Sequence, residues 1–283
     1  MRPANIVTAV ADILAGVAIS GFFLRTPDDF STFILLILST IGLYGGGVVM
    51  NDVYDAELDA VERPERPIPS GLIPKTQASM LGFLLLTGGV ICALQVSVFS
   101  GTLALVIAVA ALVYDKWAKH HSLLGPLTMG VCRGLNLLLG LSIIPGQVQA
   151  YWFLAMVPII YIAAITMISQ GEVHGGKKTT LYAAAILYAL AMAGVLYISS
   201  TRDEVVATVF FIALWGFMVF LPLRKAIRKP EGKMIGRAVK AGVLALILMN
   251  AAWASAFGVI YLAFIIILLL PLSVLMAKVF AVT

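Results

Sequence analysis

The segment FSTFILLILSTIGLYGGGVVMNDVYDAELD, residues 30–59, joins a long apolar run directly to a group of acidic side chains. Residues 30–50 contain no charged side chain, and their length matches the run of about 20 apolar residues that a helix needs to cross a bilayer. The acids that follow would therefore lie where a membrane-spanning helix leaves the hydrocarbon core. Ionisable groups at this depth are costly to desolvate, so their presence usually indicates a function.

The composition of the whole chain is typical of a membrane protein. Of its 283 residues, 61% are hydrophobic and only 12% are charged, well below the roughly 25% that is usual in soluble domains. So little polar surface excludes a soluble enzyme, a disordered chain and a nucleic-acid-binding protein, despite the net charge of +5. Cys92 and Cys132 both lie in apolar stretches and indicate neither a disulfide framework nor a metal cluster.

Hydropathy divides the chain into ten candidate membrane spans. They lie near residues 4–24, 30–50, 76–98, 101–118, 123–145, 150–169, 180–199, 204–222, 237–255 and 257–280. Ten spans of about 20 residues leave almost nothing for a domain outside the membrane. We therefore predict one all-α integral membrane domain over residues 1–283, a polytopic bundle of nine or ten transmembrane helices. The count is open because the last two spans form one apolar run, which we divide at Ser255–Gly258.

The basic residues are unevenly distributed between the two sides of this bundle. Sixteen of the nineteen Lys and Arg residues fall in the loops after even-numbered spans or at the two chain ends. The loops after odd-numbered spans hold only Arg25 and Arg202, and Arg133 lies inside a span. The positive-inside rule therefore predicts that both termini and the even-numbered loops face the cytoplasm.

Six of the fourteen acidic residues follow the second span closely. If that helix continues, Asn51, Asp55 and Asp59 recur every four residues and line one face. Asp52 lies a quarter-turn away, and Glu57 points to the opposite side. Stacked oxygen-bearing side chains favour a hard cation, and Mg²⁺ is usually held by one or two carboxylates, waters and phosphate oxygens of a substrate.

The next segment, ERPERPIPSG at residues 62–71, is rich in proline and arginine. Its prolines end the helix and stiffen an extended loop. The loop presents Arg63 and Arg66 beside the acidic face, and guanidinium groups bind phosphate oxygens through paired hydrogen bonds. A metal ion and these arginines would together hold a diphosphate. Two simpler interpretations stay open: a solvated helix end whose acids pair with the arginines, or an ordinary basic cytoplasmic loop.

These two segments carry a resemblance to a known family. The pattern NDxxDxxxD followed by RPxRPxPSG resembles the first aspartate-rich motif of the UbiA superfamily of intramembrane prenyltransferases. The segment YDKWAK, residues 114–119, is similar to the family's Tyr-x-x-x-basic-basic segment after the fourth helix, with Lys119 in a basic position. The residues RGLN at 133–136 are similar to the middle of the family's fifth helix, and the resemblance extends from the first span to about Arg237.

The family's second aspartate-rich motif, which generally has two or three Asp residues, is reduced in this chain. The corresponding stretch is SQGEVHGGKKTTL, residues 169–181, in which Glu172 is the one carboxylate and Gln170 and His174 are the other candidate ligands. Family members typically bridge diphosphate with two Mg²⁺ ions, one at each motif. Either Glu172 holds a single or weaker ion while Lys177 and Lys178 supply positive charge, or the site binds a diphosphate without efficient turnover.

The resemblance implies a Mg²⁺-dependent prenyltransferase with a cytoplasm-facing active-site cap above the bundle. Its donor would be a polyprenyl diphosphate, and its acceptor would be a lipid-phase or small molecule that the sequence does not identify. The implied metal ligands are Asn51, Asp52, Asp55, Asp59 and Glu172. The implied diphosphate contacts are Arg63, Arg66, Lys119, Lys177 and Lys178. The implied acceptor or catalytic pocket includes Tyr114, Arg133, Asn136, Asp12 and His174, although Asp12 equally fits a buried polar cluster with Asn5 and Thr8.

Two other classes of protein stay open. A transporter also carries intramembrane carboxylates, but we expect those at mid-span or beside broken helices. Here the charged groups lie at the predicted cytoplasmic ends of the second, fourth and sixth spans, which favours the enzyme. The reduced second motif motivates the other class, a family member that binds or carries an isoprenoid diphosphate without turning it over.

Overall fold

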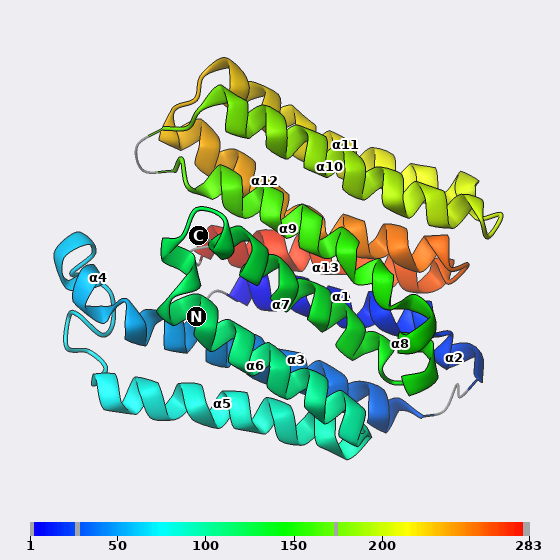
Figure 1. Ribbon diagram of the computed structural model, residues 1–283, viewed down its shortest axis with the longest axis horizontal. Helices are drawn as coiled ribbons and strands as arrows, with labels where there is room; N and C mark the ends of the chain where they lie inside the picture. Colours follow the sequence, from blue (N-terminus) through cyan, green and yellow to red (C-terminus); the bar gives the residue numbers. More distant parts are fainter. Residues whose placement is uncertain (1–2, 26–28, 173–174, 280–283) are drawn as a thin grey trace.

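The structure, a computed structural model, describes residues 3–25, 29–172 and 175–279, and every regular element in these residues is helical (Figure 1). Within these described residues, ten helical segments are long and apolar enough to cross a membrane. This confirms the predicted all-α polytopic bundle and the higher of the two span counts. Cys92 and Cys132 are both free cysteines.

Ten long helices form the bundle, and short helices connect some of them. The long ones are α1 (Pro3–Ser20), α3 (Phe30–Tyr54), α5 (Lys75–Val96), α6 (Val98–Lys116), α7 (Leu124–Leu141), α9 (Met156–Ser169), α10 (Lys178–Ser200), α11 (Val205–Arg228), α12 (Gly232–Ala256) and α13 (Ile260–Val279). The short ones are α2 (Phe22–Arg25), α4 (Ala56–Glu62), α8 (Pro145–Tyr151) and the 3₁₀ helices η1 (Ala118–His120) and η2 (Trp152–Ala155). Because α8, η2 and α9 together form one candidate span, the sixth span begins earlier than predicted.

Glycine and capping residues set helix ends that the apolar pattern alone does not define. Gly258 adopts a φ of +76° between α12 and α13, a conformation that favours glycine, and it divides the last apolar run where the sequence predicted. Gly21, with a φ of +67°, ends α1 within the first predicted span. Asp29 caps α3 by accepting a hydrogen bond from the Thr32 backbone nitrogen, and the hydroxyl groups of Thr32 and Ser31 lower the pKa of its carboxyl.

Helices α1 and α12 lie at the centre of the bundle, and α5 and α11 lie at its edges. The spanning windows of α1 and α12 are 83% buried, whereas those of α5 and α11 are 22% buried. One apolar cluster joins α1 and α7 to the helices from α9 to α13, and a second joins α1 and α7 to α3, α5 and α6. α1 and α7 therefore hold the two halves of the chain together (Figure 1).

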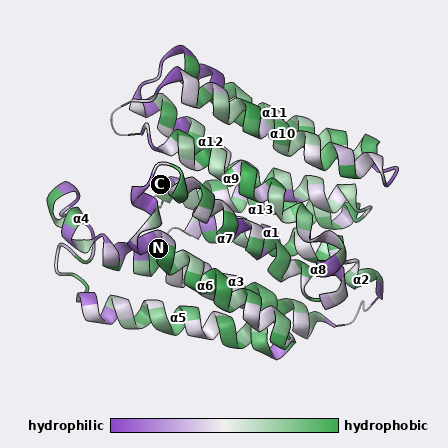
Figure 2. Cartoon of the chain, viewed as in Figure 1, coloured by the Kyte–Doolittle hydropathy of each residue, from purple (hydrophilic) through white to green (hydrophobic). Residues whose placement is uncertain are grey.

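Polar residues gather at one end of the bundle, around α4 and the connection between α11 and α12 (Figure 2). Large apolar side chains instead cover the outer faces along the helix lengths, and Phe83, Phe217 and Leu268 are each more than half exposed. Hydrocarbon solvates such faces, whereas water would not. With its ten long apolar helices, the chain is an integral, multi-pass membrane protein.

α3 and α5 approach each other closely because glycines lie along their contact. A Cβ atom added to Gly89 would lie 2.8 Å from the backbone oxygen of Ser39, which is closer than Cβ atoms pack. Small residues favour helix association in lipid by allowing such an approach. We expect Gly89→Ala to push the two helices apart and to lower the free energy of unfolding by about 1–3 kcal/mol, measured by thermal unfolding in detergent.

The preceding residue supplies the matched control for this substitution. Gly88 lies in the same helix, and a Cβ atom added there would have no heavy atom of another group within 4 Å. Gly88→Ala should leave the Tm unchanged or raise it slightly, because alanine favours the helix over glycine. Equal losses of stability in the two variants would contradict the close-packing argument.

Candidate active site at the polar end of the bundle

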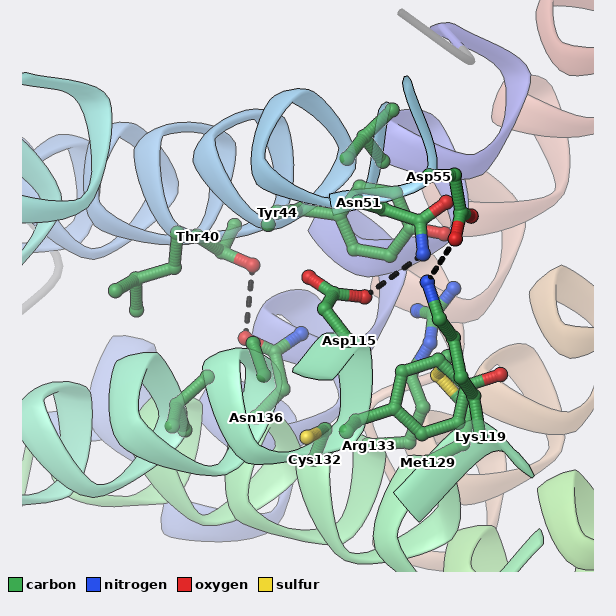
Figure 3. Close-up of a pocket in the computed structure, with 16 residues that line it drawn as sticks. Thr40, Tyr44, Asn51, Asp55, Asp115, Lys119, Met129, Cys132, Arg133 and Asn136 are labelled. Atoms are coloured by element: carbon green, nitrogen blue, oxygen red, sulfur yellow. Dashed lines mark hydrogen bonds and ion pairs between the residues drawn. The ribbon is translucent and has the colours of Figure 1, made fainter. Parts of the chain in front are cut away.

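A cavity of about 310 Å³ lies between α3, α6, η1 and α7 (Figure 3). It follows α3 from Thr40 to Asp55, which corresponds to about 22 Å of helix. Its sides are largely apolar, whereas polar residues lie at its inner and outer ends. Six of the predicted site residues line it, namely Asn51, Asp55, Tyr114, Lys119, Arg133 and Asn136.

Two polar pairs join different helices at the outer end of the cavity. Lys119 donates a hydrogen bond to Asp55 at 2.5 Å, and Asn51 donates one to Asp115 at 2.9 Å. Figure 3 shows the two pairs close together. Asp115 lies in the last turn of α6, and Lys119 lies in η1 just beyond it. The structure thus brings the first predicted motif and the 114–119 segment to one place.

The predicted acidic face persists because the backbone stays helical beyond the end of α3. The Asp55 N–H donates to the Asn51 carbonyl at 2.9 Å, and the Asp59 N–H donates to the Asp55 carbonyl at 2.8 Å. Asp55 itself, between α3 and α4, has the helical φ and ψ values of −85° and −2°. The three residues therefore keep their four-residue spacing along one side of the chain.

Arg66 pairs with the acids that lie outside the cavity. It donates to Asp59 at 2.6 Å, and it lies 3.8 Å from Asp52. This is one of the interpretations that the sequence left open, a helix end whose acids pair with a nearby arginine. Arg63, in contrast, is exposed and belongs to no ion pair among the described residues. Of the two arginines, only Arg66 reaches the acidic face.

The described residues of the reduced second motif do not line the cavity. Glu172 is partly buried beside α12, where a Cβ atom added to Gly236 would lie 3.8 Å from its Oε1 atom. Lys177 and Lys178 are exposed at the start of α10, and His174 lies outside the described residues. Within the described part of the chain, no three His, Cys, Asp or Glu side chains form a group suited to a metal ion. The roles expected of these residues stay predictions.

A buried polar network closes the inner end of the cavity. Asp12 is 1% exposed, and one of its oxygens accepts hydrogen bonds from Arg133 at 2.7 Å and from Asn136 at 3.0 Å. Its other oxygen accepts a bond from Asn250 at 2.7 Å. Arg133 also donates to the Thr8 hydroxyl at 2.6 Å. Asp12 thus belongs to a buried cluster with Thr8, and it holds the two residues of α7 that line the cavity.

Sequence reasoning assigned no role to three polar residues of the cavity wall, Thr40, Tyr44 and Asp115. Thr40 donates a hydrogen bond to Asn136 at 2.7 Å, and the Tyr44 ring centre lies 5.2 Å from the guanidinium carbon of Arg133. Asp115 is 4% exposed. An acid at the end of an apolar span is a signal that could have identified Asp115. Thr40 and Tyr44 carry no such signal, because both residue types are common in membrane helices.

Comparison with known proteins identifies the family. Residues 14–238 match the model of the UbiA prenyltransferase family. A digeranylgeranylglyceryl phosphate synthase of Methanothermobacter thermautotrophicus is 30% identical over 198 residues, which cover 69% of this chain and 68% of that protein. A protein of the same name from Methanothrix thermoacetophila is 33% identical over 152 residues, covering 53% of this chain and 56% of that protein.

Solved structures share the fold. A UbiA homologue from Aeropyrum pernix K1 superposes with a TM-score of 0.74 at 16% identity, covering 89% of this chain and 98% of that one. A UbiA homologue from Archaeoglobus fulgidus, bound to DMAPP and Mg²⁺, gives a TM-score of 0.65 at 16% identity, with coverage of 92% and 99%. The family match includes both segments that meet at the cavity and spans most of the sequence. The chain therefore belongs to the UbiA prenyltransferase family.

Proposed function

We propose that this protein transfers a prenyl group from an isoprenoid diphosphate to an acceptor in the membrane, with Mg²⁺ as its cofactor. One observation carries the proposal: the first aspartate-rich segment and the 114–119 segment meet at the outer end of a cavity whose sides are apolar. The charged end suits a diphosphate, and the apolar sides suit a prenyl chain. Membership of a prenyltransferase family supports the same reaction class.

The oxygen donors at the outer end of the cavity suit Mg²⁺, which prefers carboxylate and carbonyl-type oxygens in proteins. Asp55 uses one oxygen for Lys119, and a carboxylate has about four acceptor positions, so Asp55 retains capacity for a cation. A Mg²⁺ ion bound there supplies charge neutralisation for the diphosphate. We assign as its ligands Asn51, Asp52, Asp55, Asp59 and Glu172, of which Glu172 lies farther along the chain beside α12.

The basic residues around this end of the cavity would bind the diphosphate and stabilise it as a leaving group. Cleavage of the allylic C–O bond leaves negative charge on the diphosphate. Cations held at the leaving group stabilise that charge as it develops, which lowers the barrier to cleavage. We assign the contacts to Lys119 in the cavity, to Arg66 at the acidic face and to Arg63, Lys177 and Lys178 on exposed segments.

The prenyl carbon that loses the diphosphate is electron-poor, and it has to be kept from water until the acceptor reaches it. The apolar sides of the cavity would exclude water. An acceptor oxygen then bonds to this carbon and releases its proton. We propose that the buried carboxylate of Asp115 accepts this proton. Tyr114, Arg133 and Asn136 line the same cavity and would orient the acceptor.

The relatives indicate which acceptor to test first. The Methanothermobacter and Methanothrix proteins are both named digeranylgeranylglyceryl phosphate synthase. We therefore propose a prenylated glyceryl phosphate as the first acceptor. A total lipid extract serves as the second, because it samples acceptors that the relatives' names do not suggest.

The experiment is a prenyl-transfer assay on the purified protein in detergent, with radiolabelled prenyl diphosphates of several chain lengths. We expect label to enter an extractable lipid when Mg²⁺ is present. EDTA should abolish the transfer, and Mg²⁺ added in excess of the chelator should restore it. Transfer that proceeds equally in EDTA after removal of bound divalent ions would contradict the proposed cofactor.

A second function, an isoprenoid-diphosphate carrier, is favoured by one observation. The stretch at 169–181 has a single carboxylate, Glu172, and this residue does not line the cavity. Tight binding of the diphosphate without turnover against any acceptor would support the carrier. Absence of diphosphate binding would contradict both functions and would leave transport as the alternative.

We also propose that the outer end of the cavity faces the cytoplasm. Asn51, Asp55 and Lys119 line the outer end of the cavity. The end of the bundle where these residues lie also carries α4 and the basic connection between α11 and α12 (Figure 2). The connection before α10 lies at this end too, because the Gly176 N–H donates to the Pro230 carbonyl at 3.2 Å. Arg202 follows α10 at the opposite end. The distribution of basic residues supports this orientation through the positive-inside rule.

A further inference from the structure

A strongly basic surface lies at the polar end of α11 and α12, and none of its residues is assigned to the proposed active site. Residues 224–240 contain seven Lys and Arg residues and one acid, Glu231. Six of these cations are exposed, namely Arg224, Lys225, Arg228, Lys229, Lys233 and Arg237. No ion pair among the described residues includes any of the six. This surface, which we call the 224–240 basic surface, therefore carries positive charge that the protein itself does not neutralise.

A small hollow of about 140 Å³ lies within this surface, between the two helices. Lys225 of α11 and Arg237 of α12 line it from opposite sides. Leu221, Pro222 and Met234 form the rest of its wall, so it combines two cations with an apolar floor. A loop that only fixed membrane orientation would need positive charge but no such hollow.

An apolar stripe leads from the hollow along α11 toward the middle of the membrane. Phe210, Leu214, Phe217 and Leu221 are spaced three or four residues apart, so they share one face of the helix. All four are at least 38% exposed, and Phe217 is 70% exposed. The two cations therefore lie at the head of a continuous apolar track, an arrangement that matches the charge and shape of a phospholipid.

We propose that the hollow between α11 and α12 binds the phosphate of an anionic phospholipid, with one lipid chain lying along the stripe on α11. Lys225 and Arg237 would donate to the phosphate oxygens from two helices. Basic pockets between transmembrane helices recognise anionic head groups in this way. Arginine adds paired hydrogen bonds to phosphate that lysine cannot form. The bound lipid would bridge the two helices at their polar ends.

The test reconstitutes the protein in nanodiscs that contain equal amounts of phosphatidylglycerol and phosphatidylcholine. Native mass spectrometry of the protein released from these nanodiscs then measures which lipid stays bound. We expect phosphatidylglycerol to be retained preferentially by the wild-type protein. Lys225→Gln combined with Arg237→Gln should weaken that binding at least about thirtyfold, because it removes both charge-assisted hydrogen bonds to the phosphate. Inorganic phosphate at millimolar concentration should not displace the lipid, since it lacks the chain.

A matched variant distinguishes a specific binding site from general electrostatic attraction between the basic surface and anionic lipid. Lys229→Gln combined with Lys233→Gln removes the same charge from the same surface, but neither residue lines the hollow. This variant should retain the lipid nearly as well as the wild-type protein. Equal losses in the two double variants, or no loss in either, would overturn the proposal, and so would displacement by inorganic phosphate. The readout is independent of prenyl transfer, so its failure is distinguishable from failure of the proposed enzyme.

Discussion

Asp55→Asn is expected to lower the rate of prenyl transfer at least about a hundredfold while leaving the helical bundle folded. The substitution preserves the size of the side chain but removes the charge that faces Lys119 and the cavity. The proposed Mg²⁺ would lose one anionic ligand, and a loss of about 3 kcal/mol in stabilisation of the leaving group corresponds to that factor. Initial rates at saturating diphosphate, together with circular dichroism of the purified variant, measure both expectations.

Glu57→Gln is the matched control, because it removes one carboxylate charge two residues farther along the chain. The Glu57 side chain is 94% exposed, and its ion-pair partner is Lys75, at 3.7 Å. Exposed pairs of this kind contribute little to stability. The control should transfer prenyl groups at the wild-type rate. Full activity in Asp55→Asn, or an equal loss in Glu57→Gln, would remove Asp55 from the proposed site.

The sequence was sufficient for the spans and for the acidic face, because both depend on local patterns. A run of about 20 apolar residues has few alternatives to a membrane helix, since every backbone polar group has to be paired in hydrocarbon. The face formed by Asn51, Asp55 and Asp59 follows from helical spacing alone, and the structure keeps that spacing through the end of α3. The interruption of the sixth span by η2 has no comparable signal in the apolar pattern.

The difference between Arg63 and Arg66 shows where local patterns stop being informative. The motif repeats arginine and proline at both positions, so the sequence treats them alike. In the structure the loop turns back on itself, with the Arg66 N–H donating to the Arg63 carbonyl at 3.0 Å and the Ser70 N–H donating to the Arg66 carbonyl at 2.9 Å. This turn places Arg66 against Asp59 and leaves Arg63 exposed.

The buried network could not be predicted because its members are far apart in the chain. Arg133 is 121 residues from Asp12, and Asn250 is 238 residues from it. Spacing within one helix identifies which residues share a face but not which other helix that face meets. The sequence therefore left two environments open for Asp12, and Asn250 gave no signal beyond being a polar residue in an apolar span. Only the packing of α1 between α7 and α12 brings the three side chains together.

Asp12→Asn is expected to destabilise the protein by about 3–5 kcal/mol, the cost of leaving one partner of a buried ion pair without the other. Asp12 is the ion-pair partner of Arg133, whose side chain is 7% exposed, and the amide would leave that positive charge uncompensated inside the bundle. Charge inside a membrane bundle is costly unless it is paired. A fall in Tm during thermal unfolding in detergent measures the effect.

Asp12→Asn combined with Arg133→Gln separates the structural role of this pair from its role in the cavity. The double variant buries no charge at the site, so most of the lost stability should return. Prenyl transfer should not return with it, because the arginine that lines the cavity is missing. If the double variant regained both stability and activity, the pair would serve packing alone. If the double variant regained neither stability nor activity, the balance of charge would not be what holds the network together. The hydrogen bonds from Asn136 and Asn250 to Asp12 would then be the main source of its stability.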